Sequence, residues 1–217
     1  MIKTINTEKI IQLYKQGYFP MAENAYSEEI NFYKPKIRFI IPIKKFHIPK
    51  KLFSNFKKTS FNFKINTNFK EVIDNCKKIN KKRKDTWINS IIRNTYINLN
   101  KIGYAKSIEC YDENILIGGL YGIHIGKCFF GESMFSLKDN TSKFCLLFLV
   151  SLLIYHKFRL LDSQFFNPHL LQFGAYEITN KKYELKLKKN INNYSDFPES
   201  FNFQKSLSIL QSLIHKS

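Results

Sequence analysis

The sequence predicts a mixed α/β fold of the α+β kind, in which helices pack on a mixed sheet. Apolar residues have helical spacing in some segments and period-two spacing in others. The second half of the chain orders these patterns as strand, strand, strand, helix, strand and short helix. The chain has 217 residues, 44% of them hydrophobic. That is enough for one large domain, or for one compact domain with a smaller neighbour.

The elements of the first half are short. Apolar residues at helical spacing predict a helix over Thr7–Gly17, with Gly17 as its C-cap. The next 25 residues or so contain three prolines, and we expect only short strands there, at Asn31–Tyr33 and Arg38–Ile41. Alternation predicts a further strand at Phe61–Ile65, and helical spacing predicts a helix at Asn68–Ile79.

The second half is more regular. A helix is predicted over Ile88–Ile102, where Gly103 ends it. Period-two patterns then predict three strands, at Ala105–Tyr111, Ile115–Ile123 and Ile125–Gly131. A helix from Asn140 or Thr141 to about Lys157 is apolar nearly all round, so we expect it to be buried. The remaining predictions are a strand at Arg159–Phe165, a short helix at Pro168–Gly174 and a basic segment of open structure at Lys181–Lys189.

Positive charge is concentrated in one part of the chain. The formal net charge is +18, and Lys44–Lys84 holds fourteen basic residues against two acidic ones, a local excess of +12. Six phenylalanines are interleaved with them. Such a segment favours a polyanionic partner, either nucleic acid or an anionic membrane surface. A coding bias towards Lys, Asn and Ile gives a similar excess without any partner, so both causes stay open.

Other features exclude several classes of protein. The four cysteines form no CxxC pair and no zinc-like cluster with histidine, so we expect no metal. The first twelve residues lack the apolar core of a signal peptide. The longest apolar run, Phe144–Ile154, is far shorter than the roughly 18 residues that span a bilayer. We therefore expect a cytoplasmic protein that does not enter the membrane.

Three clusters carry residues suited to chemistry. Glu132 follows an apolar strand and is flanked by small residues, which fits either a cleft or a solvated turn. Asp162 and Gln164 are two apart on one strand, so both should point to the same face. A carboxylate in an apolar strand either pairs with a basic group or takes part in chemistry. His169 invites a catalytic role, but no Ser or Cys nucleophile stands at a suitable spacing from it.

The chain resembles the leucyl/phenylalanyl-tRNA–protein transferases, enzymes of the bacterial N-degron pathway. The resemblance rests on seven sequence blocks that occur in the order found in the family and together cover roughly Glu8 to Tyr183. The blocks are GYFPMAE at 17–23, DTWI at 85–88, GYAKSIE at 103–109, GGLYG at 118–122, FGESMFS at 130–136, LDSQ at 161–164, and Asn167 and His169 ahead of FGA at 173–175.

The resemblance implies a fold and a reaction. The fold would be a small basic N-terminal α/β domain, residues 1–84, followed by an acetyltransferase-like (GNAT) domain, residues 85–217. The reaction would move Leu or Phe, with Met as a further donor, from aminoacyl-tRNA to the N-terminal Lys or Arg of acceptor proteins and so mark them for degradation. The aminoacyl ester is already activated, so no cofactor is expected. We expect a monomer.

The resemblance also implies the site residues. Those that match the family's reaction site are Glu132, Asp162 and Gln164. Asp162 would accept a hydrogen bond from the incoming amine, with Gln164 alongside, and Glu132 could recognise the cationic side chain of the acceptor. Further substrate contacts are expected from Ser133, Met134, Phe135 and Asn167, although core packing explains Met134 and Phe135 equally well.

The terminal adenosine of the tRNA needs a stacking surface, which the resemblance assigns to Trp87, Tyr96 and Tyr33. Trp87 and Tyr96 are nine residues apart, so they face one site only if Trp87 lies at or before the start of its helix. Tyr33 stands where many relatives carry Trp, and 23–29 replaces an aromatic-rich segment. The first departure could weaken stacking without abolishing it. The second lies on the donor side, so the identity of the donor is less secure than the reaction.

Three competing functions remain. The protein could bind RNA without catalysis, or it could belong to the same family but use another donor such as Arg-tRNA. It could also be an acetyltransferase that uses acetyl-CoA. The last is disfavoured because the segment Phe135–Ser142, ahead of the buried helix, lacks the glycines of a pyrophosphate-binding loop.

Overall fold

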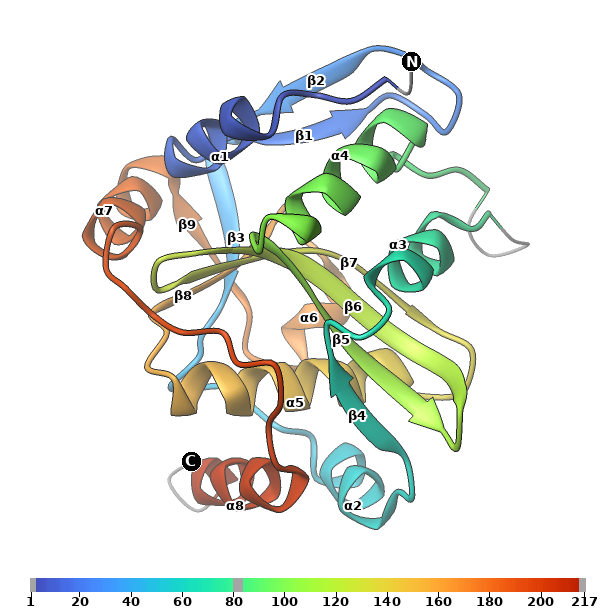
Figure 1. The fold of residues 1–217 in the computed structure, drawn as a ribbon. Helices are drawn as coiled ribbons and strands as arrows, with labels where there is room; N and C mark the ends of the chain where they lie inside the picture. The colour runs from blue at the N-terminus through green and yellow to red at the C-terminus, as the bar shows by residue number, and fades with distance from the viewer. Residues whose placement is uncertain (1–2, 80–83, 215–217) are drawn as a thin grey trace.

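The computed structural model describes residues 3–79 and 84–214, and its centre is a seven-stranded mixed sheet (Figure 1). The strand order is β4-β5-β6-β7-β8-β3-β9, and β1 and β2 form a separate two-stranded sheet. The strands are β1 Phe19–Ala22, β2 Ile30–Tyr33, β3 Ile37–Ile41, β4 Asn62–Ile65, β5 Ala105–Asp112, β6 Ile115–Ile125, β7 Cys128–Ser136, β8 Leu160–Gln164 and β9 Tyr176–Thr179. The predicted α/β fold class is confirmed.

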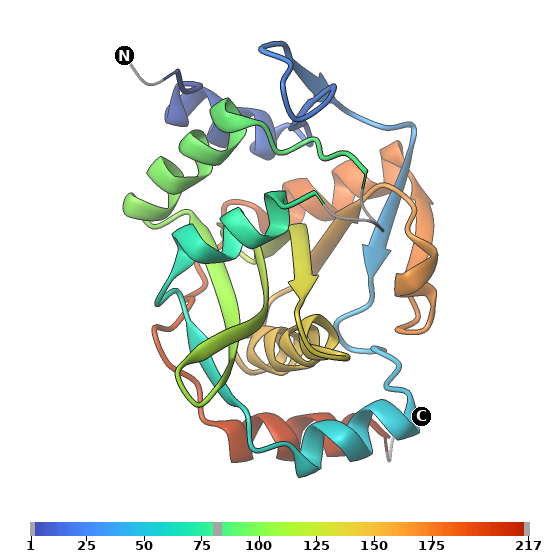
Figure 2. The same cartoon turned by 90° about the vertical axis from the view of Figure 1, so that its right-hand side faces the viewer.

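The helices cover both faces of the large sheet. They are α1 Thr7–Lys15, α2 Lys50–Lys58, α3 Phe69–Lys77, α4 Ser90–Lys101, α5 Thr141–Tyr155, α6 Pro168–Leu171, α7 Asn180–Asn190 and α8 Phe203–Ile214. α5 crosses one face, with α2 and α8 beneath it, while α1, α3, α4 and α7 lie on the other (Figure 1). The quarter turn in Figure 2 shows the same layers and places the described ends of the chain at opposite poles.

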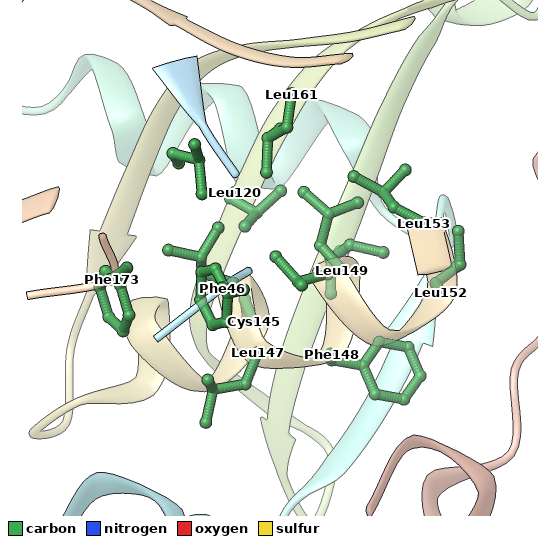
Figure 3. Close-up of a cluster of buried hydrophobic side chains, with 14 of the residues drawn as sticks. Phe46, Leu120, Cys145, Leu147, Phe148, Leu149, Leu152, Leu153, Leu161 and Phe173 are labelled. Atoms are coloured by element: carbon green, nitrogen blue, oxygen red, sulfur yellow. The ribbon is translucent and has the colours of Figure 1, made fainter. Parts of the chain in front are cut away.

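The core on the α5 side explains why that helix lacks a polar face. Eleven of its fifteen residues are buried, because the sheet covers one side of α5 and α8 covers the other. Leu120 and Leu161 meet it from the sheet, and Phe46 and Phe173 stack at its side (Figure 3). The prediction of a buried helix over this segment is therefore confirmed.

The basic segment separates into a buried side and a charged side. Phe46, Phe56 and Phe69 are buried, and the other phenylalanines of this segment pack partly buried against the core. The lysines on the same elements are mostly exposed. In α2, for example, Leu52 and Phe56 face inward and four lysines face outward. The predicted basic run continues into residues 81–83, which lie outside the described residues.

Several elements differ from the sequence-based expectation. β1, α2, β9 and α8 were not predicted, and the open segment 181–189 lies within helix α7. β7 runs to Ser136, five residues beyond its predicted end. The strands β3 and β4, which precede the expected domain boundary near residue 84, belong to the same sheet as β5 to β8. The halves of the chain on either side of that boundary therefore share one sheet.

Candidate functional site

The site is built on an irregularity in β7. Opposite β6, Ser133 pairs with Tyr121 and Gly131 pairs with Gly122, so Glu132 is an extra residue on β7, a β-bulge. A Cβ at Gly122 would lie 2.2 Å from the carbonyl oxygen of Phe130, so only glycine fits opposite the bulge. Glu132 therefore lies within β7 rather than in a turn after it, and the bulge sets the direction of its side chain.

A cavity lies beside this bulge, where two strands separate. β7 and β8 are parallel and pair from Cys128 and Leu160 as far as Phe130 and Asp162, and no pairing joins their described residues beyond that point. The cavity has a volume of about 400 Å³, within the range typical of small-molecule sites. Its apolar lining includes Ile41, Leu120, Phe129, Met134, Leu146, Leu149, Leu161 and Leu170. Its polar lining includes Glu132, Ser133, Ser163, Asn167 and His169.

Glu132 is held by donors on one oxygen only. Its Oε1 accepts hydrogen bonds from the Tyr14 hydroxyl at 2.5 Å and from Gln164 Nε2 at 2.8 Å. The Tyr96 hydroxyl in turn contacts that of Tyr14. The other oxygen, Oε2, is buried and has no hydrogen-bond partner among the described residues. The carboxylate is thus oriented by the protein while one oxygen is left to accept a hydrogen bond from a ligand.

The surroundings of Glu132 also change its acidity. Burial raises its pKa to about 7, while hydrogen bonds from Tyr14, Tyr96 and Gln164 oppose that rise and the nearby charge of Asp162 adds to it. A carboxylate with such a pKa is ionised in part at neutral pH, which suits a group that accepts and releases a proton. Burial raises the pKa of Tyr14 and Tyr96 well above the usual value, so both hydroxyls keep their protons and can donate.

Asp162 is fully buried in an ion pair, which is one of the two alternatives that the sequence left open. Arg38 on β3, also fully buried, donates from Nε to Oδ1 at 3.0 Å and from Nη2 to Oδ2 at 2.6 Å. The Tyr183 hydroxyl donates to Oδ2 at 2.7 Å, and the backbone N–H of Gln164 donates to Oδ1 at 2.8 Å. Four donors therefore fill the roughly four acceptor positions of the carboxylate. The direct contact expected between Asp162 and an incoming amine finds no free position in this arrangement.

Gln164 has a backbone conformation that is unusual for its type. Its φ of +68° lies in the left-handed region, which costs a residue other than glycine about 1–2 kcal/mol. The Asp162 carboxylate accepts its N–H, and β8 carries an extra residue, Ser163, whose hydroxyl donates to the Phe39 carbonyl. Asp162 and Gln164 thus lie on either side of a bulge in β8, and the Gln164 carboxamide donates from there to Glu132.

The three aromatic residues assigned to the adenosine lie in different surroundings. Trp87 is half-buried, lines the cavity and precedes α4, which begins at Ser90, as the spacing argument requires. Tyr33 lies outside the cavity lining, 37% exposed, against Phe19 and Phe165. Tyr96 is fully buried edge-on to Tyr121, and its hydroxyl joins the hydrogen bonds around Glu132. A buried ring has no open face on which a base could stack.

The remaining expected substrate contacts divide in two. Ser133, Met134 and Asn167 line the cavity, and so does His169. Asn167 also caps α6 by accepting a hydrogen bond from the N–H of His169. Phe135, in contrast, is buried in the core on the other side of the sheet and is not part of the cavity lining. Core packing therefore accounts for Phe135, one of the two alternatives that the sequence left open.

Sequence reasoning missed three residues of the site, Tyr14, Arg38 and Tyr183. Arg38 carried a usable signal, because it is a charged residue within the apolar run IRFII, the same pattern that singled out Asp162. Tyr14 and Tyr183 lie on the inner faces of helices, where an aromatic residue usually means core packing. Their hydroxyls could not be assigned without the neighbouring strands.

The described residues form a second hollow but offer no metal site. A groove of about 830 Å³ lies between the β1–β2 loop, α3 and α4, but none of the expected site residues lines it. Among residues 3–79 and 84–214, no group of three or more His, Cys, Asp or Glu side chains could hold a metal ion. No helix in that part of the chain has the length and apolar character needed to cross a membrane.

Known proteins match the chain over nearly its whole length. A family model described as leucyl/phenylalanyl-tRNA protein transferase matches residues 40–188. The leucyl/phenylalanyl-tRNA–protein transferase of Zymomonas mobilis is 39% identical over 215 residues, which covers 99% of this chain and 80% of that protein. The protein of the same name from Hyphomonas neptunium is 40% identical over 190 residues, covering 88% and 74%. The chain therefore belongs to the leucyl/phenylalanyl-tRNA–protein transferase family.

Proposed function

We propose that this aminoacyltransferase moves Leu or Phe, with Met as a further donor, from aminoacyl-tRNA to the N-terminal Lys or Arg of acceptor proteins and thereby marks them for degradation. The observation that carries the proposal is the cavity between β7 and β8, lined by Glu132, one oxygen of which is buried without a partner among the described residues. The names of the two relatives supply the donor class.

The apolar end of the cavity would hold the side chain of the donor amino acid. Leu146 and Leu149 from α5 and Leu120 from β6 form part of this end. Burying a Leu or Phe side chain there contributes roughly 1.5–3 kcal/mol. An Arg side chain would lose hydration in the same place without gaining a partner, because Asp162 is already paired with Arg38. This supports Leu or Phe over Arg as the donor.

The polar end would bind the reacting groups. The α-amine of the acceptor, held by Glu132 Oε2, attacks the ester carbonyl, a C–N bond forms, and the bond to the ribose oxygen breaks. Glu132 takes a proton from the amine, and that proton passes finally to the ribose oxygen. Holding the reactants together in this way accounts for several kcal/mol of the barrier. We assign the proton step to Glu132 because its pKa of about 7 suits it.

The other expected residues take supporting roles in this proposal. Trp87, at the cavity, would stack on the terminal adenosine. Tyr96 would act through Tyr14 and Glu132 rather than by stacking. Asn167 would bind the acceptor peptide. The exposed lysines of the segment 44–78, together with Lys84, would bind tRNA phosphates with little dependence on sequence.

We further infer that the sheet has the acetyltransferase-like arrangement. The support is the parallel pair β7 and β8, which separates to open the cavity, with the bulge at Glu132 next to the opening. In this arrangement the aminoacyl end of the tRNA takes the place of an acyl cofactor. The segment between β7 and α5, residues 137–140, contains no glycine, which supports a donor other than acetyl-CoA.

A transfer assay tests the proposal. The purified protein is mixed with tRNA carrying labelled Leu, Phe, Met or Arg and with peptides that begin with Arg, Lys or Ala. We expect label from Leu and Phe on the Arg and Lys peptides, and none on the Ala peptide. Absence of label with every donor, while tRNA still binds, would favour a non-catalytic RNA-binding protein. Label from Arg alone would favour the other donor class.

A further inference from the structure

Arg38 is one of three charged residues that are 0% exposed in the described part of the molecule, together with Glu109 and Asp162. Its side chain is 0% exposed, and its guanidinium lies between the rings of Phe19 and Tyr183, at 4.7 and 4.4 Å from their centroids. Nη1 donates to the Gly17 carbonyl at 2.9 Å, and the other two nitrogens donate to Asp162. The side chain therefore joins β3 to β8, α7 and the turn after α1.

Such a buried pair is not needed for stability alone. Removing two charges from water costs free energy, and the attraction between the two charges does not always offset that cost. Apolar residues in the same positions would therefore often stabilise the fold equally well. The Arg38–Asp162 pair holds the Asp162 carboxylate in one position. Two of the four donors to Asp162 come from Arg38 and a third is the Gln164 N–H. The position of the Asp162 carboxylate thus fixes the Gln164 backbone.

The Gln164 backbone, in turn, controls the geometry at Glu132. Its left-handed φ is held from inside the protein by the Asp162 acceptor. From there its carboxamide donates to Glu132 Oε1 at 2.8 Å, which leaves Oε2 as the oxygen without a partner among the described residues. A chain of contacts therefore runs from Arg38 through Asp162 and Gln164 to the group that would accept the proton.

We propose that Arg38 is a positioning residue of the transfer reaction, which acts through Asp162 and the left-handed Gln164 backbone to hold the Gln164 carboxamide against Glu132. This rests on the proposed function. The role requires the planar fork of arginine, because a lysine ammonium can supply the charge but not two parallel hydrogen bonds. In this role Arg38 contacts no substrate. Its replacement should therefore lower the rate of transfer and leave the affinity for tRNA nearly unchanged.

The experiment compares Arg38→Lys with a matched control elsewhere. Arg93 makes a similar two-nitrogen contact with Asp74, and neither residue lines the cavity, so Arg93→Lys is the control. Single-turnover transfer of labelled Phe from tRNA to an Arg-initiated peptide gives the rate and the half-saturating tRNA concentration. For Arg38→Lys we expect the rate to fall by about 10- to 100-fold, as small misplacements of reacting groups do, with half-saturation changed less than about threefold. For Arg93→Lys we expect both to stay near wild type.

The same substitution made in a Gln164→Ala protein distinguishes a positioning role of Arg38 from a general loss of structure. If Arg38 acts through Gln164, Arg38→Lys should cost much less activity in a Gln164→Ala protein than in the wild type, while its effect on melting temperature persists in both. Equal losses of rate in both backgrounds would show a purely structural role. An Arg38→Lys protein as active as the Arg93→Lys control would also overturn the inference. If the wild type itself transfers nothing, the proposed function fails instead.

Discussion

The hydroxyl of Tyr14 should set the pH at which the protein works. In Tyr14→Phe, the 2.5 Å hydrogen bond to Glu132 Oε1 is lost. Hydrogen bonds to charged groups contribute about 1.5–3 kcal/mol. A shift of one unit in a pKa corresponds to about 1.36 kcal/mol. That bond lowers the pKa of Glu132, so its loss should move the value from about 7 to about 8–9. The ionised fraction at pH 7 then falls from about a half to about 1–10%.

The transfer rate should follow that fraction. Measured in single turnovers between pH 6 and 9, with quenching faster than ester hydrolysis, the rising limb of the wild type should have its midpoint near pH 7. At pH 7 the variant should be about 5- to 50-fold slower, and it should recover most of the loss by pH 9.

The control is Tyr111→Phe, which removes a hydroxyl that contacts Glu109 on β5, away from the cavity. Its pH profile should match the wild type. Ionisation of the acceptor amine affects all three proteins alike, so the ratio of rates isolates the enzyme group. A Tyr14→Phe protein slower by the same factor at every pH would refute the assignment of the proton step to Glu132.

Three further predictions concern stability and tRNA binding. Because the pKa of Glu132 is raised in the fold from 4.5 to about 7, the folded state holds this proton more tightly than the unfolded chain, and stability falls as pH rises through that interval. Glu132→Gln should therefore raise the melting temperature at pH 8, with a gain of at most about 3 kcal/mol in the free energy of unfolding. At pH 4.5 the gain in stability should be small. The same substitution should abolish transfer. Gly122→Ala should destabilise the fold by about 1–3 kcal/mol in denaturant titrations, because the new Cβ meets the Phe130 carbonyl, whereas Gly131→Ala, whose Cβ comes no closer than 3.5 Å to the Asp162 carbonyl, should not. Replacing the exposed Lys57 and Lys58 of α2 with Ala should reduce the slope of log affinity for tRNA against log salt by about 2, and an unchanged slope would exclude α2 from the tRNA contact.

The regular parts of the fold could be predicted because their patterns are local. α5 is apolar all round, and β5 and β6 are apolar over most of their length and are separated by a short turn, so their types and approximate limits followed from the sequence. α2 and α7 were missed because each keeps only two buried side chains among many lysines. In both helices, packing against distant elements supplies the stability that the local pattern does not indicate.

The site residues could also be predicted from the sequence only in part. Glu132, Asp162 and Gln164 could be singled out, because polar residues in apolar strands are conspicuous. How they share the work could not be predicted, since it depends on two β-bulges and a left-handed residue that no spacing rule indicates. The sequence left open whether Asp162 pairs with a basic group, and its partner could not be identified because it lies 124 residues earlier, on β3, which neighbours β8 only in the folded sheet.

The place of β3 between β8 and β9 has a consequence for how the protein matures. Residues 37–41 leave the ribosome long before their partners at 160–164 and 176–179 have been made. Until then the Arg38 guanidinium has no carboxylate to accompany it into the interior, and burying it alone is strongly unfavourable. Completing the sheet is therefore a late step with long loops to close, which slows folding. The Arg38–Asp162 pair therefore cannot form until β8 has been made.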